Sequence, residues 1–158
     1  MASVAIAHPR DRAELAAEAS RYLGAAAIFV VGGIHAQQYY DAYFRVVPTI
    51  GTLFLLSFIG AGAVGVTLIS PVRLLGRRLG DLLLVLAALG GISIAVGTFV
   101  SLLVSEYTPL FGFMESGYRL AVVLTLVFDV AATLLLGLFV AIVTPQLIRE
   151  LRANRSTR

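Results

Sequence analysis

The run of residues 120–143 constrains this chain most, because it is apolar almost throughout and carries one carboxylate, Asp129, near its centre. As a helix at about 1.5 Å per residue it measures roughly 36 Å, which is enough to cross a hydrocarbon core of about 30 Å. The run therefore predicts a transmembrane helix. Polar and small residues recur at every fourth position along it: Thr125, Asp129, Thr133, Gly137 and Ala141. Residues four apart share a helix face, so we expect this stripe to face protein, since an ionised Asp against lipid costs several kcal/mol.

Composition extends this interpretation to the whole chain. Hydrophobic residues make up 59% of the 158 positions and charged residues 13%, with a mean hydropathy of +0.93. These values exclude an ordinary soluble domain and predict a polytopic, all-α membrane protein with one domain over residues 1–158. The predicted spans are residues 15–36, 47–69, 82–104 and 120–143. The chain has no Cys, which excludes disulfides and thiolate metal centres, and we predict no cofactor and no bound metal.

The first span is the least regular of the four. Its apolar run covers only residues 22–34, about 20 Å as a helix, so it must recruit its flanks. It either begins near Leu15, with Glu18 and Arg21 pairing on one helix face, or continues past His35 towards Tyr39. A signal peptide is a weaker alternative, because the charged lead is long and the residues around His35 match a small-x-small cleavage site poorly.

The arginines predict the orientation of the spans. Ten of the twelve lie in the lead, in the connection of residues 70–81 or in the tail, whereas Arg45 and Arg119 lie in the two aromatic-rich connections. The positive-inside rule then places both termini in the cytoplasm, including tails of residues 1–14 and 146–158, in an antiparallel four-helix bundle. All twelve basic residues are Arg and none is Lys, which is typical of a GC-rich bacterial coding sequence and indicates a bacterial inner membrane.

Counting depth along the spans indicates one polar layer inside the membrane. Ser57, Ser93 and Asp129 fall at mid-depth on the second, third and fourth spans, with Thr125 and Thr133 one turn to either side of Asp129. One interpretation is structural: a protonated Asp129 makes a hydrogen bond that fixes helix register. The other is functional, because intramembrane carboxylates mark proton and cation pathways.

A second group of chemically capable side chains lies at the predicted outer surface. His35 ends the first span, Asp41 lies in the first outer connection, and Glu115 and Arg119 lie in the second. His and carboxylates together suit a divalent metal or a proton acceptor, although their spacing matches no defined metal motif. The alternative is that His35 anchors the helix at the interface and the charges form Asp–Arg or Glu–Arg pairs.

Several of these residues also carry a family resemblance. The stretches GGIHAQQYYDAYFRVVPTIGTLFLL, LFGFMES and DVAAT resemble a set of uncharacterised four-helix integral membrane proteins common in actinobacteria. In that set a His ends the first helix, Pro-x-x-Gly opens the second, Gly-Phe-x-Glu precedes the fourth, and a carboxylate lies within it. The matching positions here are His35, Pro48 with Gly51, Gly112 to Glu115, and Asp129. The resemblance implies no activity, but it favours the outer face near His35 and Glu115 as a site.

Three functions remain open from the sequence. We expect a non-catalytic structural or accessory membrane subunit, whose partners are the lipid bilayer and either further copies of itself or other membrane proteins. No nucleic-acid partner is expected, because the arginines are explained by topology. The first alternative is a proton- or ion-coupled transporter subunit that uses Asp129. The second is a binder of a quinone, lipid or other apolar ligand at the outer rim near His35 and Glu115.

Overall fold

The computed structural model describes residues 9–42, 44–115 and 117–155 of the chain. Its elements are α1 (Pro9–Tyr40), η1 (Phe44–Val46), α2 (Pro48–Ile69), η2 (Val72–Leu75), α3 (Arg77–Tyr107) and α4 (Leu120–Arg155), where η denotes a short 3₁₀ helix. Each long helix contains a segment that is long and apolar enough to cross a membrane: Arg12–Tyr40, Pro48–Ile69, Arg77–Tyr107 and Leu120–Glu150. The all-α class and the four apolar helices are therefore confirmed.

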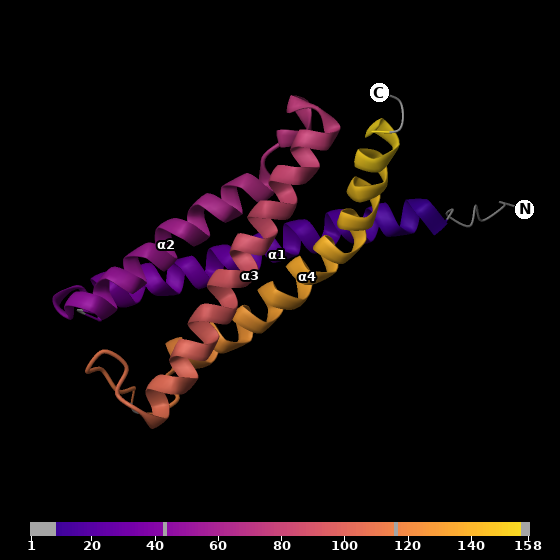
Figure 1. The fold of residues 1–158 in the computed structure, drawn as a ribbon. Coiled ribbons are helices and arrows are strands. Elements are labelled where there is room, and N and C mark those ends of the chain that lie inside the picture. The colour runs from indigo at the N-terminus through magenta and orange to yellow at the C-terminus, as the bar shows by residue number, and fades with distance from the viewer. Residues whose placement is uncertain (1–8, 43, 116, 156–158) are drawn as a thin grey trace, which may run out of the picture.

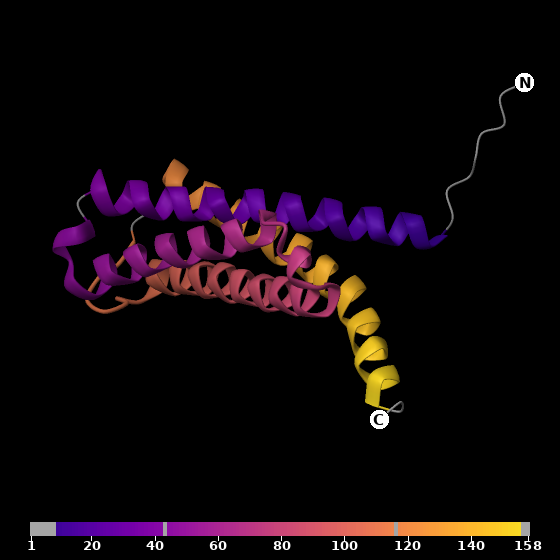
Figure 2. The same ribbon diagram turned by 90° about the horizontal axis from the view of Figure 1, so that it is seen from above.

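Three of the four helices are longer than the predicted spans, and α2 matches its predicted span to within one residue. α1 begins before residue 15, α3 begins at Arg77 rather than at residue 82, and α4 continues beyond residue 143 to Arg155. Hydropathy marks only the apolar part of a helix, whereas polar residues at its ends keep the same backbone hydrogen bonds. Pro145 lies inside α4. Because proline has no backbone N–H to donate, it can bend a helix without ending it. Figure 2 shows the last turns of α4 turning away from the other helices. Residues 1–8 and 156–158 of the predicted tails lie outside the described residues.

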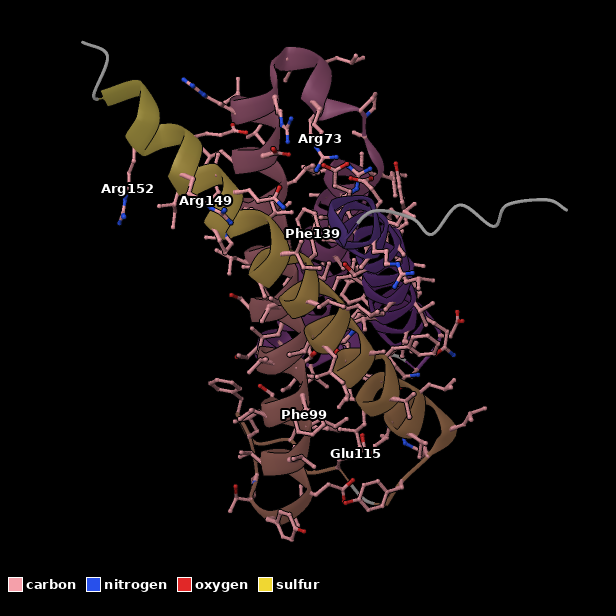
Figure 3. The ribbon with its side chains drawn as sticks, turned by 90° about the vertical axis from the view of Figure 1, so that its right-hand side faces the viewer. Arg73, Phe99, Glu115, Phe139, Arg149 and Arg152 are labelled. Atoms are coloured by element: carbon pink, nitrogen blue, oxygen red, sulfur yellow. The ribbon has the colours of Figure 1, made fainter. Side chains whose placement is uncertain are left out.

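The molecule has two ends of different chemistry. The arginine-rich end contains η2, the first turns of α1 and the part of α4 around Glu150; the aromatic end contains η1 and the connection between α3 and α4, residues 108–119. Figure 3 places Arg73 and Glu115 at opposite ends, with Phe139 between them. Two buried apolar clusters fill the space from the arginine-rich end to the middle of the helices. The first includes Leu84, Leu136 and Phe139, and the second, nearer the middle, includes Ile28, Val31 and several alanines.

Small residues bring the helices into close contact. A Cβ on Gly24 of α1 would lie 2.5 Å from Leu136 Cδ2 of α4, and one on Gly65 of α2 would lie 2.6 Å from the ring of Phe29. Such distances are shorter than van der Waals contact, so no side chain fits at either glycine without moving its neighbour. α1 therefore packs tightly against both α2 and α4.

A network of ion pairs closes the arginine-rich end. Glu18 of α1 pairs with Arg21, at 2.6 Å between Oε2 and Nη2, and with Arg73 of η2. Arg73 Nε also donates to Asp81 Oδ1 of α3 at 2.6 Å. Burial lowers the pKa of Arg73, but the hydrogen bonds to Asp81 and Glu18 outweigh this and raise it, so the guanidinium stays charged. The Glu18–Arg21 pair that the sequence offered for the first span is present, and Arg21 is buried.

A crevice at the aromatic end as the candidate functional site

A cavity of about 320 Å³ lies among the helices in the half of the molecule nearest the aromatic end. All four helices and the α3–α4 connection line it. Most of its lining residues on α1 and α4 are buried, such as His35 and Val122, whereas Leu53 of α2 and Gly97 and Ser101 of α3 are exposed. The cavity is therefore a crevice that opens sideways between α2 and α3. Figure 1 shows these two helices diverging from the turn that joins them.

A chain of aromatic rings forms one wall of the crevice. The rings of His35 and Phe54 lie 5.1 Å apart, those of Phe54 and Phe44 5.0 Å, and those of Phe44 and Phe113 5.1 Å. Centroid separations in this range are those of favourable aromatic pairs. The chain runs from α1 through α2 and η1 to the α3–α4 connection, so it ties that connection to the helices.

His35 presents one ring nitrogen without a protein partner. Its Nδ1 lies 2.8 Å from the carbonyl oxygen of Val31, and a carbonyl oxygen can only accept, so Nδ1 carries a proton. The ring is 6% exposed and lines the crevice. No hydrogen bond reaches Nε2 from any other residue that the structure describes. In the neutral ring Nε2 is thus an available hydrogen-bond acceptor.

Glu115 and Arg119 form an ion pair at the polar end of the crevice. Arg119 Nε and Nη2 donate to the two carboxylate oxygens of Glu115 at 3.0 and 2.7 Å. The backbone N–H of Glu115 donates to Ser105 O at 3.0 Å, which fixes the connection against α3. The hydrogen bonds to Glu115 raise the pKa of Arg119. Glu115 is buried while Arg119 is half-exposed, so the pair presents a cation at the rim of the crevice.

Asp129 lies behind the inner wall of the crevice. Its side chain is 1% exposed, and its Oδ2 lies 2.8 Å from the hydroxyl oxygen of Thr98 on α3. Its other oxygen, Oδ1, is buried without a hydrogen-bond partner among the described residues. Thr98 and Thr125, the residue one turn before Asp129, both line the crevice. Asp129 is therefore separated from the crevice by a single hydroxyl group.

The structure brings most of the predicted residues together and leaves two apart. His35, Glu115 and Arg119 from the predicted outer group share the crevice with Ser57, Ser93 and Thr125 from the predicted polar layer. The hydroxyl of Ser93 donates to the carbonyl of Leu89 at 2.9 Å rather than to Asp129. Asp41 is exposed in the turn after α1, and Thr133 is half-buried on α4 away from the lining. Members of the two groups predicted separately therefore line one crevice.

Sequence reasoning missed Thr98, the actual partner of Asp129, together with Gln38 and Ser105 of the crevice lining. A signal for the crevice wall was present on the third span, where Ser93, Gly97, Ser101 and Ser105 recur at every fourth position and predict one polar-to-small face. Thr98 adjoins this face. Depth counting favoured Ser93 because it assumed that every span is centred at the same level, which helices of different length and tilt do not obey.

The crevice does not resemble a metal centre. Within the described ranges no three His, Asp or Glu side chains gather closely enough to hold a metal ion. Glu115 uses both of its oxygens on Arg119. No family model matches the chain, and no curated protein or solved structure matches it either.

Proposed function

We propose that the chain is an integral protein of a bacterial inner membrane whose four helices cross the bilayer antiparallel, with both termini in the cytoplasm. The supporting observation is the distribution of charge. Ten arginines lie outside the two aromatic-rich connections, and the nine of them in the described residues belong to segments that form or adjoin the arginine-rich end. The positive-inside rule assigns that end to the cytoplasm and the crevice to the outer half of the membrane.

In this orientation the crevice binds a lipid-soluble, amphipathic ligand. The observation that carries this proposal is the sideways opening between α2 and α3, which faces the acyl chains. A ligand dissolved in the bilayer can reach the opening without passing through water. The stronger polar groups, His35, Gln38 and the Glu115–Arg119 pair, lie on the α1 wall and at the aromatic end, whereas the α2 and α3 walls add hydroxyl groups such as Ser57 and Ser101.

The lining matches such a ligand in both of its parts. Leu53, Ile94, Leu102 and Val122 supply apolar walls, whereas His35 Nε2 supplies an acceptor and Arg119 a cation at the rim. Small-molecule sites in proteins are commonly apolar with a few placed polar groups. A volume of about 320 Å³ is near the lower limit of such sites. The crevice therefore holds a ring or headgroup, and an apolar tail leaves between α2 and α3.

Native mass spectrometry of protein released gently from its own membranes tests this proposal. The discriminating variant is Gly97→Leu, because Gly97 lines the crevice and has no atom near the position of an added Cβ. The matched control is Gly62→Leu, where the space is equally open but lies outside the crevice. We expect a small-molecule adduct on the wild type and on Gly62→Leu and its loss from Gly97→Leu. An adduct that persists in Gly97→Leu would place the ligand elsewhere.

The same spectra test the alternative of a non-catalytic accessory subunit, which stays a prediction. Partner subunits or further copies of the chain would appear as higher-mass complexes that survive in both glycine variants. A wild-type chain that carries neither an adduct nor a partner would contradict both proposals.

A further inference from the structure

The hydroxyl group of Thr98 connects Asp129 to the backbone of α3, whether or not a ligand is bound. Thr98 Oγ1 lies 2.8 Å from Asp129 Oδ2 and 3.0 Å from each of the carbonyl oxygens of Ile94 and Ala95. A threonine hydroxyl has one proton to donate, and carbonyl oxygens can only accept. If Asp129 is protonated, it donates to Thr98, which donates in turn to the carbonyl oxygens of Ile94 and Ala95 in a bifurcated hydrogen bond, and all three contacts are used. If Asp129 is ionised, Thr98 must turn its proton to the carboxylate.

No countercharge lies at the level of Asp129 among the described residues. Along α4 the nearest ionisable side chain is that of Arg149, twenty positions away; Arg119 lies ten positions away, just before α4 begins, and α2 has none along its length. On α3 they are Asp81 and Glu106, and on α1 they are Arg21 and His35, all towards one end or the other. A buried carboxylate with an unpartnered oxygen and no cation is unfavourable, so the protonated form is the resting state.

Among the described residues, a path to this carboxyl group is open on one side alone. Towards the arginine-rich end, the buried cluster that includes Leu84, Leu136 and Phe139 fills the space between the helices. Towards the aromatic end, Thr98 and Thr125 line the crevice, and their hydroxyls can both accept and donate a proton. Water that enters at the aromatic end, beside the half-exposed Arg119, therefore comes within one hydroxyl of Asp129.

We propose that Asp129 is a proton-binding site that exchanges with the crevice alone, and that the Thr98 hydroxyl is the relay between them. The proton passes from Asp129 to Thr98 Oγ1 while Thr98 releases its own proton to water in the crevice, so no net charge is left on the hydroxyl. Any molecule that fills the crevice covers Thr98 and stops the exchange. Asp129 would then hold its proton for as long as the crevice is occupied.

Infrared spectroscopy of the protein in lipid vesicles tests the proposal. A protonated carboxyl group gives a C=O stretching band that shifts when its proton is replaced by deuterium. The band is assigned to Asp129 by its loss in Asp129→Asn, or by its displacement in Asp129→Glu if the amide variant does not fold. We expect the wild-type band to shift promptly in D2O. Absence of the band, or a band that does not shift over hours, would show that Asp129 is ionised or sealed and would overturn the proposal.

Two pairs of variants test the route. Thr98→Val removes the relay while keeping the shape of the side chain, and Thr98→Ser restores a hydroxyl. Gly97→Leu fills the crevice, and Gly62→Leu is its control outside the crevice. We expect exchange to slow about tenfold or more in Thr98→Val, the size of effect that follows from losing one hydrogen-bonded step. Gly97→Leu should slow it as well, and both controls should keep the wild-type rate.

The outcomes separate this proposal from ligand binding. Wild-type exchange in Thr98→Val would exclude Thr98 as the relay, and wild-type exchange in Gly97→Leu would exclude the crevice as the path. Neither result depends on an adduct in native mass spectra, because each exchange rate is compared with that of the wild type in the same vesicles. A missing adduct combined with slowed exchange in both variants would reject the ligand and retain the proton site.

Discussion

At the arginine-rich end, charged side chains neutralise one another, whereas at the aromatic end polar side chains line an open space. The first end joins three arginines and three carboxylates from α1, η2, α3 and α4: Glu18, Arg21, Arg73, Arg77, Asp81 and Glu150. At the second end Glu115 pairs with Arg119, and His35 Nε2 has no hydrogen-bond partner in the described part of the chain. The ion pairs of the arginine-rich end therefore hold the helices together, whereas the aromatic end has a polar group that is available to bind a ligand.

The apolar packing follows the same division. The buried cluster with Leu136 and Phe139 lies beneath the ion pairs, so that end is filled from the surface inwards. In the other half, α2 and α3 diverge, and the space between them is bounded by rings and hydroxyls rather than filled (Figure 1). A packed end and an open end on one set of helices imply that mutations at the two ends will differ in what they change. At the arginine-rich end, packing defects should reduce the stability of the fold. At the aromatic end, they should change how easily a ligand or water enters the crevice.

The largest effect on stability is expected from Gly80→Ala at the arginine-rich end. A Cβ there would lie 2.5 Å from Arg73 Cα and 2.8 Å from Arg73 N, so η2 would have to move away from α3. We expect the free energy of unfolding to fall by about 3 kcal/mol, at the upper end for overpacking against backbone. Thermal unfolding in detergent micelles measures it. Gly62→Ala, with nothing near its added methyl group, should stay within about 0.5 kcal/mol of wild type.

A smaller loss is expected from Arg73→Gln, which removes the cation shared by Glu18 and Asp81. We expect the free energy of unfolding to fall by about 1.5 kcal/mol. The hydrogen bonds are charge-assisted, but Arg73 is over a third exposed and solvent partly screens its charge. When the same thermal measurement is repeated at high salt, the difference in unfolding free energy between Arg73→Gln and the wild type should be smaller. Arg78→Gln is the control, since Arg78 is exposed and makes no ion pair within the described residues. Equal losses in the two variants would contradict a stabilising role for the network.

The smallest effect on stability is expected from Phe113→Ala, which cuts the aromatic chain where it reaches the α3–α4 connection. We expect the free energy of unfolding to fall by about 1 kcal/mol, the contribution of one aromatic pair. The local effect should be larger: amide hydrogen exchange at Glu115, whose N–H donates to Ser105, should accelerate while the helices keep their protection. Phe111→Ala in the same connection is the control, because that ring is 63% exposed. Acceleration in both variants would show that the ring chain does not hold the connection.

The sequence by itself determined the class of the molecule, the four apolar helices and the chemistry of the site residues. Helix length and hydropathy report directly on whether a segment can cross a bilayer, and a lone carboxylate such as Asp129 is visible in any apolar run. The Glu18–Arg21 pair was equally readable, because residues three apart on a helix always meet. These features depend on local geometry, which the order of residues fixes.

Only the tertiary structure decided that the predicted polar layer and the predicted outer group belong to one crevice, and that Thr98 rather than Ser93 meets Asp129. The physical reason is that the relative height, rotation and divergence of helices are set by contacts distant in sequence, such as Gly24 against Leu136. Small glycine contacts on α1 draw some helices together, and the divergence of α2 from α3 leaves the space open. No count along a single helix contains that information.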